Sequence, residues 1–196
     1  MKERPILMSS HMVRAILEGR KTQTRRVIAD KHLKSLPLLG VVDLATHCPY
    51  GQVGDKLWVR EKALYWDGGA AGCQRVAYQD DAELAGLLED NTRLKEFREG
   101  EGKGILGKWQ WKPSIFMPRW ASRITLEITA IRPQRLQEIT EWDAEQEGDL
   151  KRGPIASENG HYEWFKGFWD SINAKRGYGW AANPWCWCLT FRVKRD

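Results

Sequence analysis

Two stretches of the chain alternate apolar and polar residues with the period of two that a β-strand requires. Residues 123–131 read RITLEITAI, and residues 185–193 read WCWCLTFRV. Successive side chains of a strand point to opposite faces, so the apolar residues of each stretch share one face. Both apolar faces have to be buried in a core. We therefore predict strands at 124–131 and 185–193, lying in the same sheet system.

The remaining elements predict an α+β fold. Short strands are interspersed with helices, and the rhythm of a parallel βαβ protein is absent. The pattern favours a small mixed or antiparallel β-barrel with flanking helices. A length of 196 residues suits one domain, so we predict a single domain over 1–196 with a polar insertion around 67–112.

Local signals place several elements within this frame. A short helix follows Ser9 or Ser10 and is closed by Gly19 in the left-handed conformation. A second helix begins after Thr140 and ends at Gly148. The other predicted elements are an extended segment over 20–28, a strand over 57–66 and an amphipathic helix over 161–174 with Phe165, Trp169 and Ile172 on its apolar stripe.

Composition limits the cellular setting. No apolar run approaches the roughly 20 residues that span a bilayer, and the N-terminal segment lacks the pattern of a secretory signal. We expect a cytoplasmic protein with reduced thiols and no membrane association. A zinc site would have to come from His47, Cys48, Cys73, Cys186 and Cys188. Their spacing suits tetrahedral coordination poorly, so we predict no metal and no cofactor.

Positive charge is concentrated at the N-terminal end. Residues 1–35 hold nine Lys or Arg against three acidic residues. Such an asymmetry is typical of a surface that meets nucleic acid or a nucleotide, although it also occurs on faces that only keep a protein soluble. Nucleic acid or a nucleotide is therefore the predicted partner, and protein partners are left open.

The most basic segment, GRKTQTRR at 19–26, also carries candidate chemistry. A Lys beside a Thr hydroxyl is a plausible pair of base and nucleophile if burial or nearby positive charge lowers the pKa of the Lys. Lys21 and Thr24 would form that pair if a turn at Gly19 brings them together. Arg20, Arg25 and Arg26 would either supply the charge or contact phosphates.

This segment resembles the G-x-K-x-x-T-x-R signature of the ASCH family, with Gly19, Lys21, Thr24 and Arg26 at the signature positions. Later family elements are similar to GDKLWVRE at 54–61, RITLEITAI, AEQEG and WCWCLTFRV. Within the family, the chain most resembles phage and prophage members, which implies a bacterial or phage-infected host cell. The resemblance implies a PUA-like barrel and binding of RNA or nucleotides. Some small bacterial members are amidohydrolases that deacetylate N4-acetylcytidine, which implies catalytic roles for Lys21, Thr24 and Glu147.

Trp58 and Arg60 form a second candidate binding pair. They share one face of the predicted strand, where a base could stack on the indole and a phosphate could meet the guanidinium. The alternative is that Trp58 belongs to the core and Arg60 to an internal ion pair.

Three functions remain open from the sequence: an amidohydrolase for an acylated pyrimidine nucleoside or nucleotide, a non-catalytic RNA- or DNA-binding module, and a ribonuclease. The state of Lys21 discriminates between the first two. A catalytic Lys21 should be partly buried and close to Glu147, whereas a phosphate ligand should be exposed.

Overall fold

The computed structural model describes residues 1–33, 44–66, 75–78, 109–149 and 160–194. The chain divides into two compact units. The first comprises Met1–Arg4, Ala15–Leu57 and Ile124–Asp196, and the second comprises Pro5–Arg14 and Trp58–Arg123. The single domain over 1–196 stays a prediction. Of the insertion around 67–112, the described residues are 75–78 and 109–112, and the rest lies outside them.

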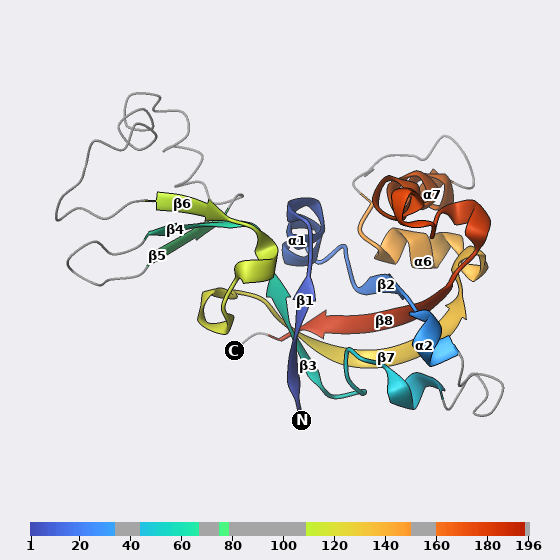
Figure 1. Ribbon diagram of the computed structural model, residues 1–196, viewed down its shortest axis with the longest axis horizontal. Coiled ribbons are helices and arrows are strands. Elements are labelled where there is room, and N and C mark those ends of the chain that lie inside the picture. The colour runs from blue at the N-terminus through green and yellow to red at the C-terminus, as the bar shows by residue number, and fades with distance from the viewer. Residues whose placement is uncertain (34–43, 67–74, 79–108, 150–159, 195–196) are drawn as a thin grey trace. The chain divides into compact units, whose positions relative to one another are not determined.

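A five-stranded sheet has the strand order β1-β3-β7-β8-β2 (Figure 1). Its strands are β1 (Glu3–Leu7), β3 (Lys56–Arg60), β7 (Thr125–Arg135), β8 (Trp185–Val193) and β2 (Gln23–Val27). Strand β8 is antiparallel to both β7 and β2. The predicted α+β class with antiparallel strands and flanking helices is thus confirmed. In the described part of the chain β1 and β2 are edge strands, so the sheet is open rather than a closed barrel.

The two alternating segments form adjacent strands, as predicted. The apolar side chains of Leu126, Ile128 and Leu189 are buried without measurable exposure. Strand β7 continues to Arg135, beyond the predicted end, and its register against β8 shifts between Ile128 and Ala130, as a β-bulge would produce. Strand β8 is buried on both faces over part of its length. Cys186 and Cys188, which face away from the apolar residues, are also fully buried.

The helices are α1 (Ser10–Leu17), α2 (Asp30–Leu33), α6 (Glu141–Gln146) and α7 (Gly160–Asn173). Gly19 is left-handed with φ 73° after α1, as predicted. Thr140 caps α6 by accepting a hydrogen bond from the Asp143 amide at 3.1 Å. Phe165 and Trp169 of α7 are buried in a cluster with Cys186 of β8. Ile172 is 42% exposed, so the predicted apolar stripe of α7 ends before this residue.

The second unit contains a three-stranded antiparallel sheet in the order β5-β4-β6. Its strands are β4 (Ala63–Trp66), β5 (Arg75–Tyr78) and β6 (Trp109–Lys112). The strand predicted over 57–66 is therefore two strands, because β3 and β4 pair in different sheets and residues 61–62 separate them. In the described part of the chain, no helix is long and apolar enough to cross a membrane.

Candidate functional site

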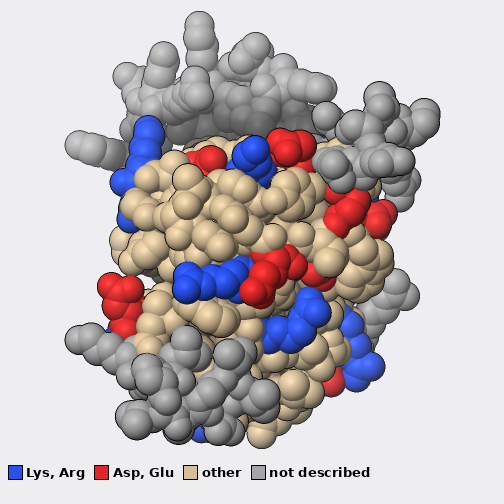
Figure 2. Space-filling model, turned by 90° about the vertical axis from the view of Figure 1, so that its right-hand side faces the viewer, with Lys and Arg blue, Asp and Glu red and all other residues tan. Residues whose placement is uncertain are grey.

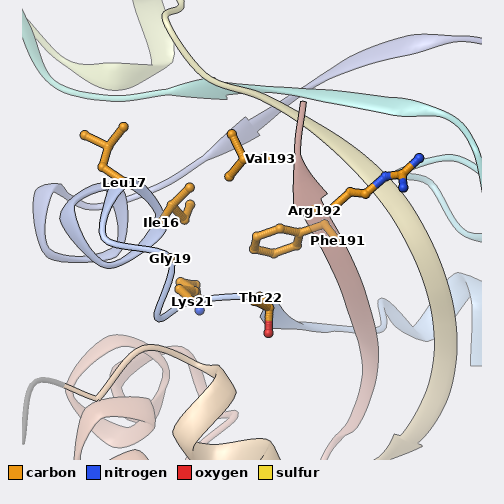
Figure 3. Close-up of a pocket in the computed structure, with 8 residues that line it drawn as sticks. All are labelled: Ile16, Leu17, Gly19, Lys21, Thr22, Phe191, Arg192 and Val193. Atoms are coloured by element: carbon orange, nitrogen blue, oxygen red, sulfur yellow. The ribbon is translucent and has the colours of Figure 1, made fainter. Parts of the chain in front are cut away.

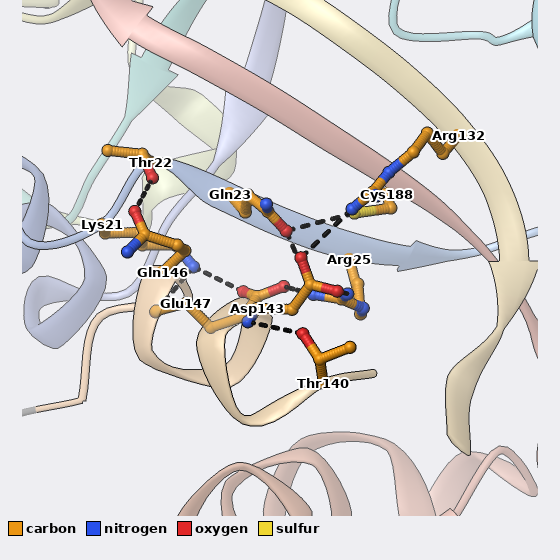
Figure 4. Close-up of polar contacts among 10 residues, drawn as sticks. All are labelled: Lys21, Thr22, Gln23, Arg25, Arg132, Thr140, Asp143, Gln146, Glu147 and Cys188. Carbon is orange, nitrogen blue, oxygen red and sulfur yellow. Dashed lines mark hydrogen bonds and ion pairs between the residues drawn. The ribbon is translucent and has the colours of Figure 1, made fainter. Parts of the chain in front are cut away.

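Lys21 and Glu147 meet in the interior of the first unit, although 126 positions separate them in the sequence. The Lys21 ammonium nitrogen, Nζ, lies 2.7 Å from Glu147 Oε2 and 2.9 Å from the Glu147 backbone oxygen (Figure 4). Their side chains are 0% and 2% exposed. Burial lowers the pKa of Lys21, and Arg26 and Arg25 act in the same direction, against the opposing effect of Glu147. The buried Lys–Glu pair expected for a catalytic site is present.

The segments around the pair are held together by backbone contacts. The amide of Thr22 donates to the Gln146 carbonyl at 3.0 Å, and the two side chains also hydrogen-bond. Arg20 donates to the carbonyls of Gly148 and Asp149 at 2.9 and 2.8 Å. The segment 19–26 and the end of α6 therefore form one polar junction, which fixes Glu147 against Lys21.

Gly148 is the closest point of this junction. Its φ is +96°, and a Cβ at this position would lie 2.8 Å from the Cβ of Ala15 and 3.0 Å from the Cβ of Lys21. Neither neighbouring atom is the end of a flexible side chain, so the backbone would have to move. The absence of a side chain at residue 148 is therefore what lets the end of α6 approach Lys21.

We expect Gly148→Ala to lower the free energy of unfolding by roughly 3 kcal/mol, as severe overpacking does. The matched control is Gly177→Ala, since Gly177 has φ +82° but a Cβ at this position would have no atom within 4 Å. That variant carries only the left-handed backbone cost of about 1 kcal/mol. Urea unfolding of both variants measures the difference. Equal losses would show that close approach at residue 148 contributes nothing.

The ion pair continues through β2 and α6 to the surface. Arg25 contacts Glu147 Oε1 at 3.1 Å and Asp143 Oδ2 at 3.2 Å, and Arg132 contacts Asp143 Oδ1 at 3.1 Å. Burial opposes ionisation of Asp143, but Arg25, Gln23 and Arg132 together lower its pKa. The side chain of Arg25 is 0% exposed and that of Arg132 is 51% exposed. The network thus consists of four buried charged side chains, Lys21, Glu147, Arg25 and Asp143, and reaches the surface at the half-exposed guanidinium of Arg132.

Thr24 lies one residue before Arg25, so the alternation of β2 turns its side chain to the opposite face of the strand. The residue is buried, and its hydroxyl has no hydrogen-bond partner among the described residues. No contact joins it to Lys21 there. The structure therefore brings together Lys21 and Glu147 of the three predicted catalytic residues, and it leaves Thr24 as a separate buried hydroxyl.

The predicted phosphate-binding arginines are largely engaged within the protein. Arg20 holds backbone carbonyls and also pairs with Glu18, while Arg25 is buried between two carboxylates. Burial lowers the pKa of Arg26, and Tyr50 and Glu147 act against that effect. Figure 2 shows acidic side chains interspersed with basic ones on one face of the molecule. The segment 19–26 is thus not an open basic surface.

Trp58 and Arg60 belong to the second unit. The Arg60 guanidinium carbon lies 4.6 Å from the centre of the Trp58 ring, which confirms that the two side chains share a face. Trp58 is 8% exposed and packs in a buried cluster with Tyr65 and Met117. Trp58 therefore belongs to the core, as in the alternative interpretation of the sequence, and Arg60 stacks on its ring. The role of the pair in binding stays a prediction.

A pocket of about 460 Å³ opens beside the Lys21 segment. Figure 3 shows Phe191 pointing toward the loop that carries Gly19 and Lys21, whereas Arg192 extends away from it. The lining is mainly apolar and comes from α1, the following loop and β8: Ile16, Leu17, Gly19, Lys21, Thr22, Phe191, Arg192 and Val193. A flat, mostly apolar group attached to a polar one would match this lining.

Sequence reasoning did not identify Asp143, Arg132 or Gln146 as members of the junction. The sequence did contain a signal for Asp143: it stands four residues before Glu147, about one helical turn away, so the two side chains face the same way.

Burial raises the pKa of Cys48 to about 11 and that of Cys186 to about 12, so both thiols stay protonated at neutral pH. The described residues contain no cluster of three or more His, Cys, Asp or Glu that would hold a metal ion.

Comparisons with known proteins give one structural likeness. No family model matches the chain, and no curated protein matches it. The crystal structure of an ASCH domain from Lactobacillus crispatus JV V101 is similar to this chain with a TM-score of 0.44 and 13% sequence identity. The alignment covers 98% of this chain and 79% of the other chain.

Proposed function

We propose that this chain is an ASCH-type amidohydrolase of the phage or prophage kind, which removes the acyl group from N4-acetylcytidine or a related acylated pyrimidine nucleoside or nucleotide. The observation that carries the proposal is the buried contact between Lys21 and Glu147. The sequence predicts that burial of Lys21 distinguishes an enzyme from a phosphate-binding module. A lysine without solvent exposure is poorly placed to contact a phosphate.

Hydrogen bonding at Lys21 favours a neutral amine. Its Nζ contacts two acceptors among the described residues, both belonging to Glu147. An ammonium has three N–H donors, one more than the acceptors that the described residues supply. An amine has two N–H donors and a lone pair, which fits two acceptors. The lone pair is then available to accept a proton from a nucleophile.

The proposed reaction uses Lys21 as general base. Lys21 takes a proton from water as the water oxygen attacks the acyl carbonyl carbon. The carbonyl π electrons move to oxygen and a tetrahedral intermediate forms. The C=O bond then re-forms as the C–N bond to the pyrimidine N4 breaks, and N4 receives the proton, which releases cytidine and acetic acid. Glu147 holds the ammonium that forms and relays the proton toward the leaving amine. Thr24 donates its buried hydroxyl to the developing oxyanion or orients the water, and it attacks directly only if substrate binding brings it to Lys21.

The runner-up is an RNA-binding module in which the basic segment contacts phosphates. Arg132, whose side chain is 51% exposed, and Arg176, which is also exposed, leave some cationic surface that RNA could contact. The engagement of Arg20 and Arg25 inside the protein favours the enzyme. A ribonuclease would use the same basic residues but needs a groove of polymer length.

The proposal is tested by incubating the purified chain with N4-acetylcytidine, with acetylated RNA and with unmodified RNA, and by reading the products by mass spectrometry. We expect cytidine and acetate from the nucleoside and intact chains from unmodified RNA. Cleaved RNA would favour the ribonuclease, and binding without any product would favour the RNA-binding module.

A substitution at the pocket tests where the substrate lies. Leu17 lines the pocket and is 50% exposed, so Leu17→Trp fills space there without disturbing the core. We expect KM to rise about tenfold or more, equivalent to about 1.4 kcal/mol, with kcat little changed. Leu7, 47% exposed and outside the pocket, provides the control variant Leu7→Trp. Equal kinetics for both variants would place the substrate elsewhere.

A further inference from the structure

The carboxylate of Glu147 is shared between two basic side chains. One oxygen, Oε2, accepts from Lys21, and the other, Oε1, accepts from Arg25 at 3.1 Å. Arg25 is held in turn by Asp143, and it also lies 5.8 Å from the centre of the Phe165 ring. Because both ends of the guanidinium have a carboxylate and one face has an aromatic ring, its position is fixed. Glu147 is therefore fixed from the side opposite Lys21.

Charge balance gives this arrangement a consequence. The chain of contacts holds two carboxylates, Glu147 and Asp143, and two guanidiniums, Arg25 and Arg132. Guanidiniums stay charged in proteins, so these four groups already sum to zero. A protonated Lys21 would add a fifth charge, which Arg26 and Arg25 repel. Because Arg25 takes up one oxygen of Glu147, it weakens the hold of Glu147 on a proton at Lys21.

We propose that Arg25, held in place by Asp143, is a positioning residue that shares the charge of Glu147, so that Lys21 gives up its proton and forms the free amine at a lower pH. This inference rests on the proposed function for the role of that amine in a reaction. The protonation of Lys21 itself does not depend on whether the chain hydrolyses any substrate. The charged groups around Lys21 are Glu147 after α6 and Arg25 and Arg26 on β2, with Asp143 acting through Arg25.

The two positioning residues should shift the titration of Lys21 in opposite directions. Arg25→Gln leaves Glu147 with Lys21 as its only cation, so Lys21 retains its proton to higher pH. Asp143→Asn removes a negative charge and frees Arg25 to pair with Glu147 alone, so Lys21 loses its proton at lower pH. Arg25→Lys keeps the charge and should restore titration close to that of the parent. A merely structural role predicts no such opposite signs.

The experiment titrates Lys21 directly in the full chain labelled with ¹³C at lysine Cε. The Lys21 signal is assigned by its loss in Lys21→Arg, and its chemical shift is followed against pH in the parent, Asp143→Asn, Arg25→Gln and Arg25→Lys. Deacetylation of N4-acetylcytidine is measured across the same pH range. For Arg25→Gln we expect about tenfold lower kcat/KM at pH 7 for each unit by which the midpoint rises, with recovery at high pH.

Opposite shifts in the NMR titration support the positioning role, even if no variant hydrolyses the nucleoside; that result would overturn only the proposed function. Unchanged midpoints in both Asp143→Asn and Arg25→Gln, or shifts of the same sign in these two variants, would overturn the inference. If Arg25→Gln fails to fold, Asp143→Asn and Arg25→Lys still decide the result, because each predicts a definite midpoint relative to the parent.

Discussion

Lys21→Arg and Lys21→Met should each lower kcat/KM for N4-acetylcytidine by roughly 10²- to 10⁴-fold, the usual contribution of a general base. Arginine keeps the positive charge and the contact with Glu147, but its guanidinium cannot accept a proton at working pH. Methionine keeps much of the buried volume and removes the nitrogen. Two variants with opposite charge behaviour and the same loss of activity would isolate proton transfer as the missing function.

Measuring the unfolding free energy of the Lys21 variants distinguishes a loss of catalysis from a loss of folding. Glu147 retains its contact with Arg25 when Lys21 is replaced, so it is not left as an unpaired buried charge. We expect Lys21→Met to lose about 1 kcal/mol of unfolding free energy, as for one net hydrogen bond. Full activity in either variant would contradict the mechanism. The matched control on the same segment is Arg20→Lys, which keeps a cation at a residue that contacts backbone carbonyls.

The pH dependence follows from the direction of the Lys21 shift. Burial lowers the pKa of Lys21 from its ordinary value of about 10.4, so the free amine forms at a lower pH than for an exposed lysine. Activity in the parent should rise with pH through that pKa and then level off. The unfolded chain binds the extra proton in this interval, so the unfolding free energy also rises with pH toward about 10.4.

Most of the sheet could be predicted because the deciding signals are local. The alternation in 123–131 and 185–193 requires strands whatever the rest of the chain does. One error came from tertiary context. Residues 57–66 read as one strand, but β3 and β4 pair with different partners. The buried thiols expected at Cys186 and Cys188 are present, and in the structure Cys186 packs against Phe165 and Trp169 of α7.

The site could be predicted only in part for a similar reason. The resemblance of GRKTQTRR to a known signature supplied Lys21 and Thr24, and the end of the helix supplied Glu147. The roles of Arg20 and Arg25 were open, because a sequence does not reveal which arginines face carboxylates in the interior. Gly148 was read as a helix stop. Its second role, close approach to Ala15 and Lys21, depends on contacts between segments far apart in the chain.

Thr24→Val should uncouple stability from activity. Valine has nearly the shape of threonine, so packing in β2 is kept while the hydroxyl is removed. That hydroxyl is buried and has no hydrogen-bond partner in the described part of the chain, and such a group costs about 1–3 kcal/mol of stability. We therefore expect Thr24→Val to unfold at an equal or higher urea concentration than the parent.

The same variant should lose activity by roughly 100-fold or more, the loss observed when one donor to a developing oxyanion is removed. A substrate that satisfied the Thr24 hydroxyl would account for an unfavourable group at a buried position, since functional groups are often kept at a cost in stability. Thr24→Ser keeps the hydroxyl and should retain most of the activity. A Thr24→Val enzyme as active as the parent would remove Thr24 from the site and leave Lys21 and Glu147 to act with water alone.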